Sequence, residues 1–269
     1  MRLNRLRNAL VAAPLVASLA TQAQPAAPAP SYAIMSMVGD KMTLVIHQIG
    51  TGSNLDANRR IEVPMPDDTL HGMAAFAADD AVRRLQANAK TSLFVTRDPK
   101  LLALQDKLTD SKDDMAALAQ QLKPLLASSS ASHLLLITKH RAEARLRVLD
   151  GSIGSGRLSG LGFYVDKETR MTERDTGNHS TGFVAPYAYL SVTAFDMATL
   201  RPLRQEAATA SETVSTAASK AALVPWDAMT TEQKFDALKR VTRTAIDTIV
   251  PKVLEAQDSA RQTPAQALK

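Results

Sequence analysis

Apolar side chains follow two different periods along the chain, and each period predicts a different kind of element. Residues 134–137 are apolar at every position, which predicts an interior strand buried on both faces of a sheet. Residues 184–194 alternate instead, so that Tyr187 and Tyr189 share one strand face. These two tyrosines are expected to form either a binding surface or a half-buried layer under the last helix. Further strands are predicted at 32–38, 42–46, 92–96 and 203–210.

A period of three to four residues predicts helices at roughly 69–90, 99–126 and 230–255. The range 99–126 is expected to break near Thr109, after which Ser111 and Asp114 have the spacing of a capping box for a further helix. Thr230 followed by Gln233 is typical of a capping box at the start of the last of these helices. Pro251 is expected to kink that helix or to end its regular part. The Ala-, Ser- and Thr-rich stretch 207–222 predicts no definite element.

Together these elements predict an α/β fold in a single domain over residues 31–257, with helices covering a mixed sheet of about five to seven strands. The C-terminal strands are expected to be antiparallel, and Ser92–Ile137 is expected to form a β-α-β crossover. The highly charged segment 166–181 predicts either the tip of a long hairpin or a mobile loop. Residues 258–269 are predicted to be a disordered tail.

Residues 1–23 have the three parts of a secretory signal peptide. The segment MRLNRLRN carries three arginines and no acidic residue, the apolar ALVAAPLVASLA follows it, and small residues lead to a cleavage site near Ala23. The apolar run is too short to span a bilayer. Residues 24–30, QPAAPAP, predict an extended Pro/Ala linker. The sequence therefore predicts a periplasmic or secreted protein without a transmembrane helix.

The net charge changes once this leader is set aside. The full chain has 32 basic and 27 acidic residues and a pI near 9.5, but three of the arginines belong to the leader. The remaining charge of about +2 removes the main support for a nucleic-acid partner. The chain has no cysteine, which excludes disulfides, thiolate catalysis, cysteine-ligated zinc and a cysteine-linked lipid anchor. No cofactor is expected.

A glycine-rich turn follows the run 134–137 and holds Gly151, Gly154, Gly156 and Arg157. A phosphate-binding loop of the Walker type needs Lys and then Ser or Thr after its last glycine, with a helix behind them. Arg157 and a leucine hold those places, and the residues that follow predict a strand. We therefore interpret this segment as a turn or bulge in which the chain reverses between strands.

The polar loops at 39–59 hold the cluster most suggestive of function, which consists of Asp40, His47, Asp56, Asn58 and Arg59. The other interpretation of this cluster is ordinary hydrogen bonding within loops. No His-x-His, His-Glu-x-x-His or Gly-x-Ser-x-Gly spacing occurs, so motifs predict no catalytic residue and no metal ligand. A metal site built from distant loops, with Asp40, His47 and His140 as ligands, is the alternative.

One resemblance covers the last third of the chain. Its residues are the strand 188–194, the turn that starts at Asp196, the return strand near 203–210 and the amphipathic helix after them. This arrangement resembles α/β domains of envelope proteins, namely the curli-secretion lipoprotein, the penicillin-binding-protein activator lipoprotein and the TolB N-terminal domain. The resemblance implies a role in assembly or interaction rather than in catalysis. This chain departs from the two lipoproteins because it lacks the lipidated cysteine.

These observations favour a non-catalytic exported interaction module that acts in cell-envelope assembly or maintenance and has a protein partner there. The alternative is an exported hydrolase whose site is formed by the 39–59 loops and the 150–162 glycine-rich turn. A third hypothesis is a protein that binds a small ligand. Convergence of Asp40, His47, Asp56 and His140 in one pocket would favour the hydrolase.

Overall fold

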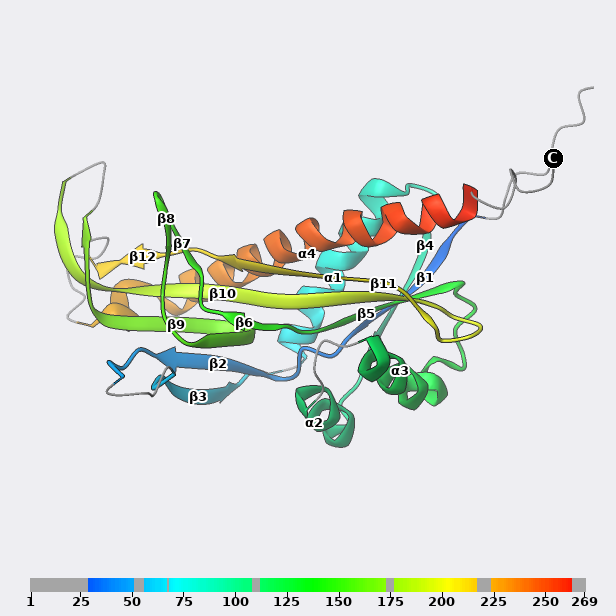
Figure 1. Ribbon diagram of the computed structural model, residues 1–269, viewed down its shortest axis with the longest axis horizontal. Coiled ribbons are helices and arrows are strands. Elements are labelled where there is room, and N and C mark those ends of the chain that lie inside the picture. The colour runs from blue at the N-terminus through cyan, green and yellow to red at the C-terminus, as the bar shows by residue number, and fades with distance from the viewer. Residues whose placement is uncertain are drawn as a thin grey trace, which may run out of the picture.

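The computed structural model describes residues 29–50, 56–66, 68–107, 112–172, 177–216 and 224–262 (Figure 1). The predicted signal peptide, most of the predicted linker and residues 263–269 of the predicted tail lie outside the described residues. In the part of the chain that the structure describes, no helix is long and apolar enough to cross a membrane.

In the described residues, a ten-stranded mixed sheet organises the fold, and a short hairpin of two further strands lies beside it. The sheet is therefore larger than the predicted five to seven strands. Its strands are β1 (Ser31–Ser36), β2 (Lys41–Ile46), β3 (Arg59–Pro64), β4 (Lys90–Val95), β5 (His133–Lys139), β6 (Arg141–Glu143), β9 (Arg157–Thr172), β10 (His179–Asp196), β11 (Pro202–Ser211) and β12 (Val214–Ser215). The hairpin consists of β7 (Leu146–Val148) and β8 (Gly151–Ile153).

The 18-residue strand β10 connects the two parts of this sheet, because one of its edges pairs with two different strands along its length. Its first part pairs with β9, ending with Tyr189 opposite Gly160, and from Leu190 onward it pairs with β5. Beyond β9 lie β2 and β3, whereas beyond β5 lie β1 and β4. We call the point between Tyr189 and Leu190 the sheet fork, since two groups of strands separate there.

Most strand predictions are confirmed. The strand β5 is buried at residues 134–137, where each side chain is 0% exposed, and it runs parallel to β1. The strand β11 returns antiparallel to β10, and β9 and β10 form the predicted hairpin. The expected crossover leads from β4 to β5, which lie parallel on the two sides of β1.

The helices differ from their predicted bounds. They are α1 (Thr69–Leu85), α2 (Pro99–Lys107), α3 (Lys112–Leu126) and α4 (Thr231–Gln262), with a 3-10 turn η2 (Pro225–Ala228) before the last. The predicted helical range 99–126 holds two helices, α2 and α3, which precede and follow the break expected near Thr109. Pro251 does not end α4, which continues to Gln262. The capping box is confirmed, because Gln233 N–H donates to Thr230 Oγ1 at 3.2 Å and Thr230 N–H donates to Gln233 Oε1 at 2.8 Å.

Both faces of the sheet are covered, but in different ways. The helices α1 and α4 run along one face and form the largest apolar cluster there (Figure 1). On the other face, α3 and α2 cover the β1–β5 end, while the segment from β6 to β8 covers the β9–β10 end. Tyr187 and Tyr189 are fully buried in this last cluster. Both expectations for them were therefore wrong, because they neither form an exposed surface nor lie under the last helix.

Candidate functional site

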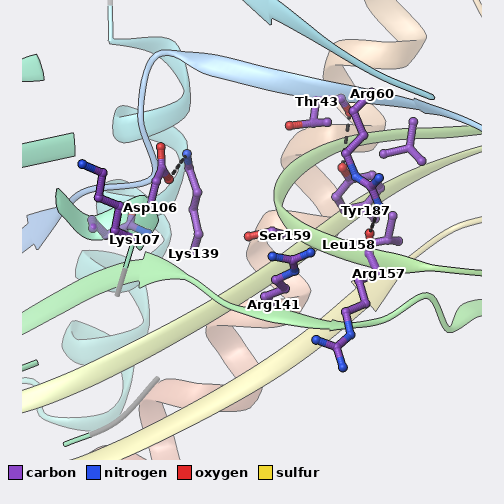
Figure 2. Close-up of a pocket in the computed structure, with 12 residues that line it drawn as sticks. Thr43, Arg60, Asp106, Lys107, Lys139, Arg141, Arg157, Leu158, Ser159 and Tyr187 are labelled. Atoms are coloured by element: carbon purple, nitrogen blue, oxygen red, sulfur yellow. Dashed lines mark hydrogen bonds and ion pairs between the residues drawn. The ribbon is translucent and has the colours of Figure 1, made fainter. Parts of the chain in front are cut away.

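A cavity of about 540 Å³ lies at the sheet fork, on the face where the covering layer has two separate parts. Its lining residues come from the end of α2, the end of β5, β6, the start of β9 and the strands β2, β3 and β10 (Figure 2). We call it the fork pocket, and it is lined by Thr43, Val45, Arg60, Gln105, Asp106, Lys107, Lys139, Arg141, Arg157, Leu158, Ser159 and Tyr187.

Among the described residues that line the pocket, five of twelve are cationic and Asp106 is the single carboxylate. Lys139 Nζ donates to Asp106 Oδ1 at 2.7 Å at one end of the pocket, and Figure 2 shows this pair beside α2. At the other end Arg60 reaches Asp56, which lies outside the lining, at 2.6 Å. Among the described residues, Arg141 has no ion-pair partner. The pocket therefore has a surplus of positive charge.

The floor of the pocket is rigid and buried. Tyr187 is 0% exposed, and its hydroxyl donates to the carbonyl oxygen of Thr43 at 3.3 Å. Burial raises the pKa of Tyr187, so this hydroxyl stays protonated. Gln105 is only 5% exposed, yet its Oε1 has no hydrogen-bond partner among the described residues. A buried acceptor of this kind costs about 1–3 kcal/mol unless a ligand or water satisfies it.

Asp56 connects the fork pocket to the glycine-rich turn. Its Oδ2 accepts hydrogen bonds from Arg60 and, at 3.1 Å, from the backbone N–H of Arg157. Gly156 has a φ of +76°, and a Cβ there would lie 2.7 Å from Asn58 Nδ2 and would overlap Asp56. Burial alone would raise the pKa of Asp56, but its hydrogen bonds from Arg60 and Arg157 hold it below its usual range.

His47 and Asn58 form a second part of this network. Asn58 Nδ2 donates to the carbonyl oxygen of Ser155 at 2.7 Å, and its Oδ1 lies 3.2 Å from His47 Nδ1. The hydroxyls of Ser155 and Tyr164 lie 3.1 and 3.0 Å from the same nitrogen. These contacts hold the glycine-rich turn against the end of β2.

The structure therefore brings together five of the nine residues in the two predicted groups: His47, Asp56, Asn58, Gly156 and Arg157. The other four lie apart from them. Asp40 borders a cavity of about 310 Å³ beside His71 and Arg97, and Arg59 is the exposed first residue of β3 rather than part of a loop. Gly151 pairs with Val148, and Gly154 packs beside Leu146.

The metal alternative receives no support. His140 lies after β5, where its backbone N–H donates to the carbonyl oxygen of Tyr189 at 3.0 Å. Asp40 borders the cavity beside His71 and Arg97. The Nδ1 of His47 instead contacts Asn58, Ser155 and Tyr164. Within the described ranges, no group of three or more His, Asp or Glu side chains could hold a metal ion.

Sequence reasoning missed Arg60, Lys139 and Arg141, and one signal could have found two of them. The run TKHRAEARLR at 138–147 places four lysine and arginine residues at and after the end of a buried strand. A strand that ends in consecutive cations at a change of direction is a reasonable place to expect an anion site. The three arginines at residues 1–23 account for most of the net charge and hide this local cluster in the composition.

Comparisons with known proteins give distant structural likenesses only. No family model matches the chain, and no curated protein matches it. A Xanthomonas campestris protein of the DUF330 family is 9% identical, with 89% of this chain and 94% of that one covered and a TM-score of 0.38. A neuraminyllactose-binding hemagglutinin homolog from Helicobacter pylori is 7% identical, with 87% and 90% covered and a TM-score of 0.36. PelC from Paraburkholderia phytofirmans, a dodecamer, is 11% identical, with 86% and 91% covered and a TM-score of 0.29.

Because these TM-scores lie below 0.5, the function has to be argued from the residues of this chain. None of the three proteins is named as a member of the envelope classes that the last third of the chain resembles. That resemblance stays an expectation.

Proposed function

We propose that the protein is a non-catalytic exported interaction module of the cell envelope, and that it holds an anionic group of its partner in the fork pocket. The observation that supports this proposal is the surplus of cations around the pocket: five basic side chains against one lining carboxylate. Because the cavity is partly enclosed by strands and α2, a charge bound there is desolvated more than on an open surface, which strengthens its attraction to Arg141 and Lys139. The predicted signal peptide supports export.

A site-specific cross-link tests this function. We would place the photoreactive residue benzoylphenylalanine at Lys107, an exposed position at the pocket rim, in the organism that produces the protein. We expect a covalent adduct with an envelope component, and we expect Arg141→Gln to abolish it. The control site is Lys167, an exposed position in β9 outside the pocket lining. The absence of an adduct at Lys107, or an adduct that Arg141→Gln leaves unchanged, would contradict the proposal.

A hydrolase is the second candidate, and one arrangement favours it. Ser155 Oγ lies 3.1 Å from His47 Nδ1, and His47 Nε2 lies 4.0 Å from Asp166 Oδ2. A catalytic base must offer a lone pair to its serine. Here Asn58 Oδ1, an acceptor, faces the same Nδ1, which favours a proton on that nitrogen. Asp166 is also beyond hydrogen-bond distance of Nε2, so the arrangement suits a structural contact better.

Labelling with a fluorophosphonate probe separates the two candidates. This probe reacts with activated serines, so the interaction module should remain unlabelled. Labelling of the exported protein that disappears in both Ser155→Ala and His47→Gln would instead establish the hydrolase.

A further inference from the structure

The charge around the fork pocket constrains which anion it can hold. Arg60 already has Asp56 as its partner, and Lys139 has Asp106. The remaining lining cations are Lys107, Arg141 and Arg157, for which no carboxylate partner exists among the described residues. A ligand with a single carboxylate would compensate one of these three charges. A phosphate monoester, with a charge near −2 at neutral pH, compensates more of them.

Arg141 is the side chain best placed to bind such a group. It comes from β6, and Figure 2 shows its guanidinium between the Asp106–Lys139 end and the Arg60 end of the pocket. A guanidinium presents paired N–H donors that match two phosphate oxygens, whereas an ammonium acts as a point charge. Arg141 therefore supplies the paired contact. The Lys139 ammonium has three donors and gives one of them to Asp106, so it keeps donors for a ligand in the same pocket.

The rest of the lining indicates that the phosphate is attached to something larger. A volume of about 540 Å³ is in the range of pockets for small organic ligands and exceeds the size of a phosphate ion. The uncharged polar lining consists of the hydroxyls of Thr43 and Ser159 and the amide of Gln105. Gln105 Oε1 is buried without a partner, so it can accept a hydrogen bond from a ligand hydroxyl. The tyrosine in the lining is fully buried and offers no exposed ring face for stacking.

Building on the proposed function, we infer that the fork pocket binds a phosphate group carried on a hydroxyl-bearing ligand, that is, a phosphorylated sugar or a glycerol phosphate. Arg141 and Lys139 bind the phosphate oxygens. Gln105 accepts a hydrogen bond from a hydroxyl of the sugar or glycerol. A free ligand and a lipid headgroup that carries its phosphate as a monoester present the same chemistry to the pocket.

Calorimetric titration of the purified protein tests this inference, with glucose 6-phosphate, inorganic phosphate, glucose and succinate as probes. We expect glucose 6-phosphate to bind about tenfold or more tightly than inorganic phosphate, and glucose and succinate to bind at least a hundredfold more weakly. Arg141→Gln should weaken glucose 6-phosphate binding at least tenfold. The matched control is Arg170→Gln, which removes the same charge from an exposed strand position outside the pocket and should change nothing. Gln105→Met should reduce the preference for glucose 6-phosphate over inorganic phosphate without lowering the melting temperature.

A second arm identifies the source of the phosphate. Vesicles of phosphatidylcholine with and without phosphatidylinositol 4-phosphate, whose headgroup carries a phosphate monoester on a hydroxyl-bearing ring, would be floated with the protein. Binding in either arm that Arg141→Gln weakens supports the inference and identifies the ligand as free or lipid-bound. Absence of binding in both arms, equal affinity for succinate, or binding that Arg141→Gln leaves unchanged overturns it. If the inference fails while the cross-link at Lys107 still depends on Arg141, the pocket holds a different anion and the proposed function stands.

Discussion

At Gly162 the strands β9 and β2 approach so closely that no side chain fits between them. A Cβ there would overlap the carbonyl oxygen of Thr43 and lie 2.7 Å from the hydroxyl of Tyr187. The missing side chain is what lets Tyr187 donate to Thr43 and close the floor of the fork pocket.

Gly162→Ala should therefore destabilise the protein by about 2–3 kcal/mol, because the new methyl group must push two paired strands apart. Gly72→Ala is the matched control, since a Cβ at that position in α1 would lie 3.6 Å from the Phe76 ring, an ordinary contact. Replacing a helical glycine by alanine should stabilise by up to about 1 kcal/mol. Urea denaturation of the two variants measures both effects, and a neutral Gly162→Ala would show that the strands can separate freely.

His71 links the stability of the fold to pH. It is 1% exposed in α1, and burial lowers its pKa even though the backbone of Ser36 and the nearby Asp68 and Asp40 act in the opposite direction. Its Nδ1 has no partner among the described residues. A histidine whose folded pKa is depressed stabilises the fold above the unfolded pKa, near 6.5, and that stability is lost as the pH falls below it.

The wild type should therefore lose about 1 kcal/mol more stability than His71→Gln when the pH is lowered from 7.5 to 5.5. The reason is that one additional proton bound by the unfolded state lowers the free energy of unfolding by at most about 1.4 kcal/mol per pH unit. Urea denaturation at the two pH values gives the difference directly. An equal loss in both proteins would mean that His71 takes up its proton without unfolding.

At the scale of elements, the long apolar and alternating segments could be predicted, because burial of one or both strand faces requires apolar side chains at regular positions. The strand β5 and the two arms of the β9–β10 hairpin are such cases. The short strands β6 and β8 could not, because RAE and GSI have no period and are strands only through their partners. The division of the range 99–126 into α2 and α3 was in contrast predictable, because Ser111 and Asp114 have the spacing of a capping box at the start of a second helix.

The same reason explains what could be predicted of the candidate site. Turn chemistry marks Asp56, Asn58 and Gly156 locally, so their presence in one network was partly foreseeable. The fork pocket depends instead on residues far apart in the chain: Arg60 from β3 meets the backbone of Arg157, 97 positions later. That meeting follows from the pairing of β2 with β9, which no local pattern contains.

At the scale of the whole molecule, β1 is the central strand of the part of the sheet that contains β5 and β4. The strand β1 pairs with β5 on one edge and with β4 on the other, and Ala33, Ile34 and Met35 are 0% exposed. Backbone hydrogen bonds also fix its start, because the carbonyl oxygen of Pro30 accepts the N–H of Lys90 at 3.1 Å.

We predict that folding does not require residues 1–23. A chain that begins at Gln24 should have the same melting temperature as the full chain to within about 2 °C, because the first strand residue is Ser31. A chain that begins at Gly39 should fail to fold cooperatively, since removing β1 leaves apolar residues of α1 and α3 without cover. Mass spectrometry of the protein recovered from the producing cells provides the companion measurement. A mature chain that starts at Gln24 is expected, and recovery of an intact Met1 would contradict cleavage near Ala23.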